Sequence, residues 1–83
     1  MATVTRAERR PRTLLHDPAA VTRAREEAGL RKVDVANALE VSLSLISEIE
    51  GGTRNLTLPN LVRLARILGV HPKTLRAQHA PAR

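Results

Sequence analysis

The fold of this 83-residue chain is decided by residues 32–52, KVDVANALEVSLSLISEIEGG. Apolar side chains recur every three or four positions on either side of a short break, which predicts two amphipathic helices at 32–39 and 43–50. Ser42 fits the N-cap of the second helix, because its hydroxyl can accept a hydrogen bond from an unpaired N–H of the first turn. The connection is too short for shallow antiparallel packing, so the two helices are predicted to cross steeply as a helix-turn-helix.

Three more helices are expected around this pair. An aspartate–proline pair at 17–18 and a glycine at 29 predict a helix at about 18–28. A strong apolar stripe predicts another helix from 57 or 58 to 68, and a short fifth helix is expected from 72 to about 78. No stretch alternates strictly between apolar and polar residues, so the predicted fold class is all-α.

Composition limits how such a chain is stabilised. It contains no Cys, Phe, Tyr or Trp, so disulfides and thiolate metal sites are excluded and the core must be aliphatic. No apolar run approaches the roughly 20 residues of a membrane span, and no apolar segment follows the N-terminal basic residues as in a signal peptide. We therefore expect one cytoplasmic domain at 17–78, with a disordered, flexible basic arm at 1–16 and a frayed tail at 79–83.

The net charge of +6 is unevenly distributed along the chain. Residues 1–16 hold four arginines and one glutamate, residues 17–50 hold four basic and seven acidic side chains, and residues 51–83 hold six basic side chains and no acidic one. Two basic flanks suit a polyanionic partner such as nucleic acid, and the alternative is a solvated arginine-rich surface. The arginines of the N-terminal flank are Arg6, Arg9, Arg10 and Arg12. They are expected either to wrap DNA or enter its minor groove, or to belong to a tail without fixed contacts.

One ordered set of residues runs through the whole folded part of the sequence. Its members are Gly29, Leu30, Val35, Ala36, Val41, Ser42, Ile46, Ser47, Ile49, Glu50, Gly52, Arg54, Asn55, Leu58, Leu61, Ala65, Leu68, Gly69 and Val70. In order and spacing they resemble the helix-turn-helix family of the phage Cro protein and phage repressors, also called the xenobiotic-response-element family, over about residues 18–76. The resemblance implies a five-helix, lambda-repressor-like DNA-binding domain whose helix at 43–50 reads the major groove of double-stranded DNA.

The same resemblance assigns the reading face of that helix by position. The side chains at or near the groove are Leu43, Ser44, Leu45, Ser47 and Glu48. A leucine could touch a thymine methyl group, and Glu48 could accept from a cytosine amino group. Alternatively, Leu43 or Leu45 packs inside and leaves the base contacts to the polar side chains, or Glu48 forms an intramolecular pair.

Contacts to phosphates are implied on both sides of the reading helix. Ser42 would contact a phosphate, and Lys32 occupies a position where the family usually has a glutamine that grips the DNA backbone. Lysine holds a phosphate as a point charge without the amide's two-way hydrogen bonding. Thr53, Arg54 and Asn55 would lie along the adjacent phosphates, and the alternative for the last two is an ordinary polar turn.

Two further positions bear on the structure of the domain. Arg25 and Glu50 match the family's partly buried ion pair, which ties the first helix to the reading helix. Glu40 stands where the family's turn usually has glycine, so a left-handed backbone there would cost on the order of 1 kcal/mol. The turn is therefore expected to be wider than usual.

Enzyme chemistry is not expected. The histidines, His16, His71 and His79, lie in connections or tails with no Cys, Asp or Glu at catalytic or metal-ligand spacing, so no metal or cofactor is predicted. No glycine-rich phosphate loop is present, because the glycines at 51–52 read as a helix stop.

The predicted function is that of a transcriptional regulator, a repressor, encoded by a bacterium or a phage and associated with the nucleoid. The alternative is an antitoxin or accessory subunit that uses the same fold mainly to bind a protein partner. One such domain reads about half a site, so a homodimer on a near-palindromic sequence is expected, with its contact in the fifth helix and the tail from Leu75 onward.

Overall fold

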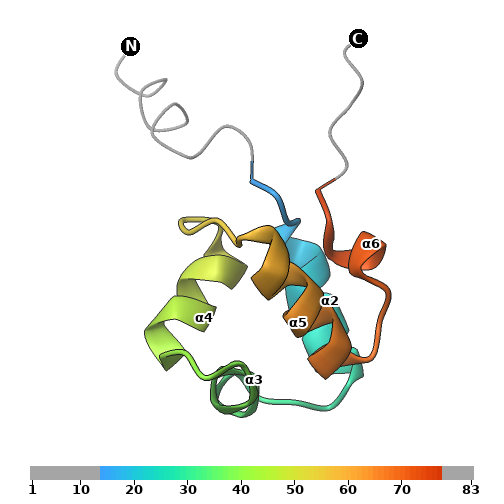
Figure 1. The fold of residues 1–83 in the computed structure, drawn as a ribbon. Helices are drawn as coiled ribbons and strands as arrows, with labels where there is room; N and C mark the ends of the chain where they lie inside the picture. Colours follow the sequence, from blue (N-terminus) through green and yellow to red (C-terminus); the bar gives the residue numbers. More distant parts are fainter. Residues whose placement is uncertain (1–13, 78–83) are drawn as a thin grey trace, which may run out of the picture.

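Five α-helices follow one another in the part of the chain that the computed structural model describes, residues 14–77. They are α2 (Pro18–Glu27), α3 (Lys32–Leu39), α4 (Leu43–Gly51), α5 (Leu58–Leu68) and α6 (Pro72–Leu75). The described residues form no β-strand, and one isolated bridge joins His16 to Arg76. The all-α, five-helix prediction is confirmed (Figure 1).

The helices begin and end where local capping groups lie. Asp17 Oδ1 accepts a hydrogen bond from the N–H of Ala19, and Ser42 Oγ accepts one from the N–H of Leu45. The N-cap Thr57 accepts a hydrogen bond from the N–H of Asn60 in α5, and Gly69 ends that helix with a φ of 74°. These caps satisfy backbone groups that a helix leaves unpaired at its ends, so the helix bounds follow from short-range chemistry.

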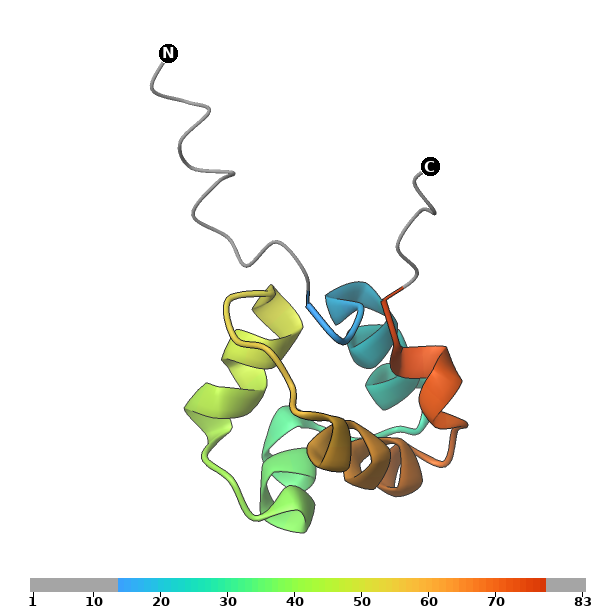
Figure 2. The ribbon, with the colours of Figure 1, turned by 45° about the horizontal axis from the view of Figure 1, so that its top comes forward.

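The core is aliphatic and lies between all five helices (Figure 2). Its buried members are Val21, Ala24, Val35, Ala36, Leu39, Ile46, Ile49, Leu56, Leu61, Leu64, Ala65, Leu68 and Leu75. Helix α5 contributes the most of them, since one whole stripe of that helix is buried. The small side chains of Ala36 and Ala65, both 2% exposed or less, let neighbouring helices approach closely without aromatic filling.

Helices α3 and α4 cross steeply, as the short connection predicts. Figure 1 views α3 almost along its axis while α4 runs across the page. The turn between them contains Glu40 at φ 64° and ψ 46°, which is the left-handed region, and no other non-glycine residue in the described chain has a positive φ. Glu40 therefore adopts the left-handed conformation itself, at the cost of on the order of 1 kcal/mol that this backbone carries for a non-glycine residue.

The folded domain starts earlier than predicted. Residues 14–17, which we call the N-terminal strap, pass between the segment after α4 and the end of α6. The N–H of Asp17 donates to Leu75 O over 2.8 Å, and the N–H of Ala77 donates to Leu15 O over 3.0 Å. Leu15 packs against the core, so the predicted arm at 1–16 loses its last residues to the fold.

Helix α6 is shorter than the predicted helix from 72 to 78. The chain leaves the helical conformation at Arg76, whose ψ of 145° is extended, because that residue pairs with His16 of the strap. Leu75 is fully buried in the protein's own core, so its side chain is not available for the dimer contact that the sequence suggested. Gln78 and the tail that follows lie outside the described residues.

Candidate nucleic-acid interface

Helix α4 is anchored from behind by apolar side chains. Ile46 and Ile49 are 1% and 2% exposed, and Leu45 packs against the core beside them. Leu45 was predicted among the groove-facing residues, and its packing removes it from that set. Successive residues of a helix are about 100° apart, so these three side chains share one side of α4.

The opposite side of α4 is open to solvent. Ser44, Ser47 and Gly51 are exposed and lie near the middle of that side by helical periodicity. Leu43, which is 48% exposed, and the half-exposed Glu48 flank them on the two edges. The structure therefore separates two leucines that the sequence left equivalent, with Leu45 inside and Leu43 outside.

The start of α4 combines a cap with free donor groups. Ser42 Oγ accepts the N–H of Leu45 at 3.0 Å, which leaves the hydroxyl hydrogen available to donate outward. The first N–H groups of the helix have no carbonyl partner within the helix and carry the positive end of its dipole. This arrangement can accommodate a phosphate at Ser42, in keeping with the predicted contact.

The loop after α4 is held to the helix through Glu48. Arg54 Nε donates a hydrogen bond to Glu48 Oε1 at 3.1 Å, and Arg54 Nη2 lies 3.0 Å from the same oxygen in an ion pair. The backbone N–H of Thr53 donates to the carbonyl oxygen of the same glutamate at 3.0 Å. The intramolecular alternative for Glu48 is thus realised, and the ion pair offsets the repulsion that a free carboxylate would exert on phosphates.

Asn55 has a structural task that the sequence did not indicate. Its Oδ1 accepts the N–H of Leu15 at 2.7 Å, which ties the N-terminal strap to the loop that carries Arg54. In the same region a Cβ at Gly52 would lie 3.4 Å from Pro18 Cγ and 3.9 Å from Leu14 Cδ1, so the strap also packs on the backbone of that loop. The side-chain oxygen Oδ1 of Asn55 is therefore bound to the strap, and the N–H groups of the same side chain remain to bind a phosphate.

His16 was predicted to lie in the disordered N-terminal arm, and the structure instead buries it in the folded domain. The ring is fully buried, and Nε2 lies 2.8 Å from the carbonyl oxygen of Ile49, near the end of α4. Because a carbonyl only accepts, Nε2 carries the hydrogen in this bond, and Nδ1 has no partner among the described residues. The available signal was the apolar pair at 14–15, which marked the point where burial begins.

The N-terminus of α3 carries its own charge pair. The N–H and the guanidinium of Arg31 both donate to the carboxylate of Asp34, with the shortest distance 2.8 Å. These hydrogen bonds lower the pKa of Asp34 and raise that of Arg31. Lys32, the predicted phosphate contact, is the first residue of this helix and has no carboxylate partner among the described residues.

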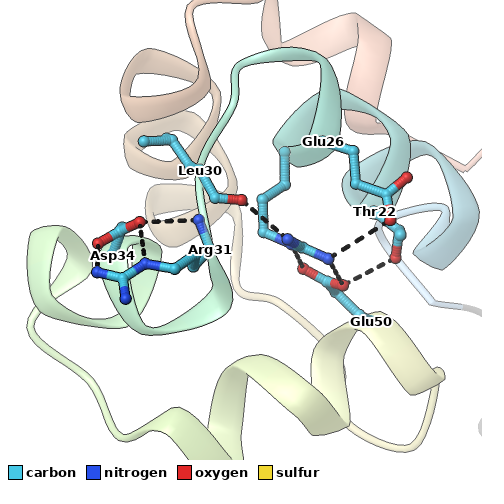
Figure 3. A network of polar contacts seen from close by, with 7 residues as sticks. Thr22, Glu26, Leu30, Arg31, Asp34 and Glu50 are labelled. Carbon is cyan, nitrogen blue, oxygen red and sulfur yellow. Dashed lines mark hydrogen bonds and ion pairs between the residues drawn. The ribbon is translucent and has the colours of Figure 1, made fainter.

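Arg25 and Glu50 form the predicted ion pair and tie α2 to the last turn of α4 (Figure 3). Arg25 Nε lies 2.7 Å from Glu50 Oε2, and Nη2 lies 3.2 Å from Oε1. The hydroxyl of Thr22 donates to Oε1, and Arg25 Nη1 donates to Leu30 O. The hydrogen bond to Glu50 raises the pKa of Arg25, so the guanidinium stays protonated and fixes the direction of α4 relative to α2.

The remaining predicted contacts lie elsewhere. Arg6, Arg9, Arg10 and Arg12 fall outside the described residues. No group of three or more His, Cys, Asp or Glu side chains that could hold a metal ion occurs within residues 14–77. No helix in that range is long and apolar enough to cross a membrane.

A steep helix pair with an anchored second helix and an exposed front is the arrangement that the sequence resemblance implied, and a family described as "Helix-turn-helix domain" matches residues 19–78. The chain belongs to the helix-turn-helix family. This helix-turn-helix protein is 35% identical over 49 residues to control protein C.BamHI of Bacillus amyloliquefaciens, a match that covers 59% of this chain and 60% of that protein. The chain thus spans less than two thirds of the length of that relative.

A solved structure agrees with the family assignment. The helix-turn-helix chain is similar, with a TM-score of 0.65 and 26% sequence identity, to the restriction-modification controller protein C.AhdI from Aeromonas hydrophila. The similarity covers 69% of this chain and 86% of that one. The predicted membership of the Cro and phage-repressor type of helix-turn-helix protein is confirmed.

Proposed function

We propose that this helix-turn-helix protein is a sequence-specific regulator of transcription that places α4 in the major groove of double-stranded DNA. The observation that carries the proposal is the two-sided environment of α4. Ile46, Ile49 and the Arg25–Glu50 pair hold the helix from behind, while Leu43, Ser44 and Ser47 are exposed in front. A helix fixed in this way presents its side chains to base edges at little cost in conformational entropy.

The names of the similar proteins support a regulatory role. One is called a control protein and the other a restriction-modification controller protein. For this chain we propose repression, because a protein that occupies the major groove of a promoter competes sterically with polymerase. A promoter–reporter fusion measured with and without the protein distinguishes repression from activation. The corresponding location is the bacterial cytoplasm, on the nucleoid or on a phage genome.

Contacts to phosphates are proposed on both sides of α4. Lys32 and Ser42 lie at the N-termini of α3 and α4, and Thr53 and Arg54 lie in the loop that follows α4. Arg54 keeps hydrogens on its guanidinium that Glu48 does not use, because the pair occupies only Nε and Nη2. Such contacts position the protein on DNA without reading its sequence.

The N-terminal arginines are proposed as an additional DNA contact. The strap ends beside the loop that carries Arg54, because the Leu15 N–H is bound to Asn55. The four arginines precede that anchor by three to nine residues in the sequence. A minor-groove contact by this arm would add affinity that falls with salt.

A homodimer on a near-palindromic site is proposed, since one reading helix covers about half a site. With Leu75 buried, the candidate contact moves to α5, where Leu58 and Val62 are 51% and 37% exposed. These two side chains are four residues apart on one helix face and form an apolar pair. Sedimentation of Leu58→Ser with Val62→Ser should show a lower dimer fraction than the unchanged protein, and equal dimer fractions would rule out this face.

Selection of binding sites from random double-stranded DNA tests the main proposal. The expected result is one enriched, near-palindromic sequence, followed by a steep loss of affinity with salt in gel-shift titrations. Arg54→Ala should weaken binding, while Arg23→Ala, which removes an equal charge from the exposed face of α2, should leave it nearly unchanged. Weak binding without sequence preference would instead favour the role of an antitoxin or accessory subunit that binds a protein.

A further inference from the structure

Leu43 is an isolated apolar side chain on the reading face of α4. It is the first residue of the helix and is 48% exposed, whereas Leu45, two positions later, packs against the core. Its neighbours Ser42 and Ser44 are exposed, as is Ser47 one turn further along. A large apolar side chain therefore stands among hydroxyl groups at the end of α4 that enters the groove first.

The chemistry of the major groove restricts what such a side chain can meet favourably. Base edges there present hydrogen-bond donors and acceptors, and the apolar group among them is the C5-methyl of thymine. 5-Methylcytosine carries the same group at the same ring position. Pressed against a polar edge, Leu43 would remove water from a donor or acceptor without replacing its hydrogen bond, which is unfavourable.

The serines do not compensate for such a mismatch at Leu43. Ser44 lies about 100° around the helix from Leu43, and Ser47 lies on the same side as Leu43 but one turn, about 6 Å, further along the axis, so both hydroxyls meet neighbouring positions in the groove. Ser42 already accepts the N–H of Leu45 at the N-cap, where its hydroxyl is the proposed contact to a phosphate. Discrimination at the base opposite Leu43 thus depends on apolar contact alone.

We propose, on the basis of the DNA-binding function proposed above, that Leu43 recognises the C5-methyl group of one pyrimidine in each half-site. Burial of one methyl group is worth about a fourfold change in affinity. On a site with two-fold symmetry the two half-sites together give about fifteenfold. Leu43 is therefore a specificity-determining residue, and the methyl group comes from either thymine or 5-methylcytosine.

The test uses the site selected from random DNA and the full chain. Each thymine is replaced in turn by deoxyuridine, which removes the methyl group and retains base pairing, and each cytosine in turn by 5-methylcytosine. We expect one position per half-site at which the methyl group raises affinity about fourfold. An effect at a thymine identifies thymine as the source, and an effect at a cytosine identifies 5-methylcytosine.

Variants assign the effect to the side chain. In Leu43→Ala the methyl effect at that position should vanish, while circular dichroism and urea melts should show an intact fold, because the replaced side chain is half exposed. Arg23→Ala, which shortens an exposed side chain of α2 outside the reading face and outside the proposed dimer contact, should keep the methyl effect.

Two results would overturn the inference. One is specific binding that no single methyl group changes by more than about twofold. The other is a methyl effect that persists in Leu43→Ala. Both leave sequence-specific binding itself intact, whereas failure to select any site would remove the proposed function and the inference with it.

Discussion

Replacement of Arg25 by alanine should destabilise the domain by about 3–5 kcal/mol. The guanidinium donates two hydrogen bonds to Glu50, whose side chain is only 5% exposed, and one to the carbonyl of Leu30. Alanine would leave a buried carboxylate with the Thr22 hydroxyl as its remaining side-chain donor among the described residues. A domain of this size has a total stability of roughly 4–12 kcal/mol, so the loss is a large share of it.

A second ion pair provides the matched control. Arg31 and Asp34 lie 2.9 Å apart, but their side chains are 77% and 33% exposed. Because exposed pairs contribute about 0–1 kcal/mol, Arg31→Ala should shift the urea midpoint only slightly. A double variant, Arg25→Met with Glu50→Leu, buries no unpaired charge and should recover much of the stability lost in Arg25→Ala.

Urea melts followed by circular dichroism at 222 nm supply the measurement, since the chain has no Trp or Tyr for fluorescence. Equal small losses in Arg25→Ala and Arg31→Ala would refute the reasoning, because burial would then make no difference. Equal large losses in Arg25→Ala and the double variant would also refute it. In that case the loss of stability would come from lost side-chain packing and not from an unpaired buried carboxylate.

Further expectations concern strain, acid stability, DNA affinity and the strap. Glu40→Gly should raise stability by up to about 1 kcal/mol in urea melts by relieving the left-handed backbone, whereas Glu40→Ala keeps the strain and should show no such gain. Hydrogen bonds from Arg31 lower the pKa of Asp34. The ionised carboxylate therefore stabilises the fold above the ordinary carboxyl pKa of 3.8, and this stabilisation is lost as the pH falls below that value. In thermal melts over this pH range, Asp34→Asn should lose less stability on acidification than the unchanged protein does. Arg54→Ala should weaken binding to selected and scrambled DNA alike and reduce the salt slope by about 1. Asn55→Ala should speed hydrogen exchange at the Leu15 amide, which loses its acceptor, and unchanged exchange there would contradict the strap's attachment.

The helices were largely predictable because their signals act within a few residues. A cap such as Ser42 or Thr57 binds an N–H three positions ahead, and a stop such as Gly69 acts on the turn just before it. The end of α6 was misjudged because a distant partner, His16, draws Arg76 into an extended conformation. Local patterns contain no information about that partner.

Within the candidate interface, the resemblance indicated the reading helix and the Arg25–Glu50 pair, but not how each side chain is used. Asn55 was expected at a phosphate, yet it binds Leu15, 40 residues away in the chain. Glu48 was left between a base contact and an internal pair, and the bend of the loop after α4 brought Arg54 to it. Such contacts depend on where loops come to lie, which periodicity does not specify.

For this protein the sequence alone determined the number of helices, most of their limits, the aliphatic nature of the core and the steepness of the helix pair. Those properties arise from capping, side-chain volume and connection length, all of which act between near neighbours in the chain. Only the tertiary structure decided that Leu43 faces outward while Leu45 is packed inside, and that the strap belongs to the fold. The first depends on how the packing of the whole core rotates α4, and the second depends on contacts such as the hydrogen bond between Leu15 and Asn55, which are 40 residues apart in the chain.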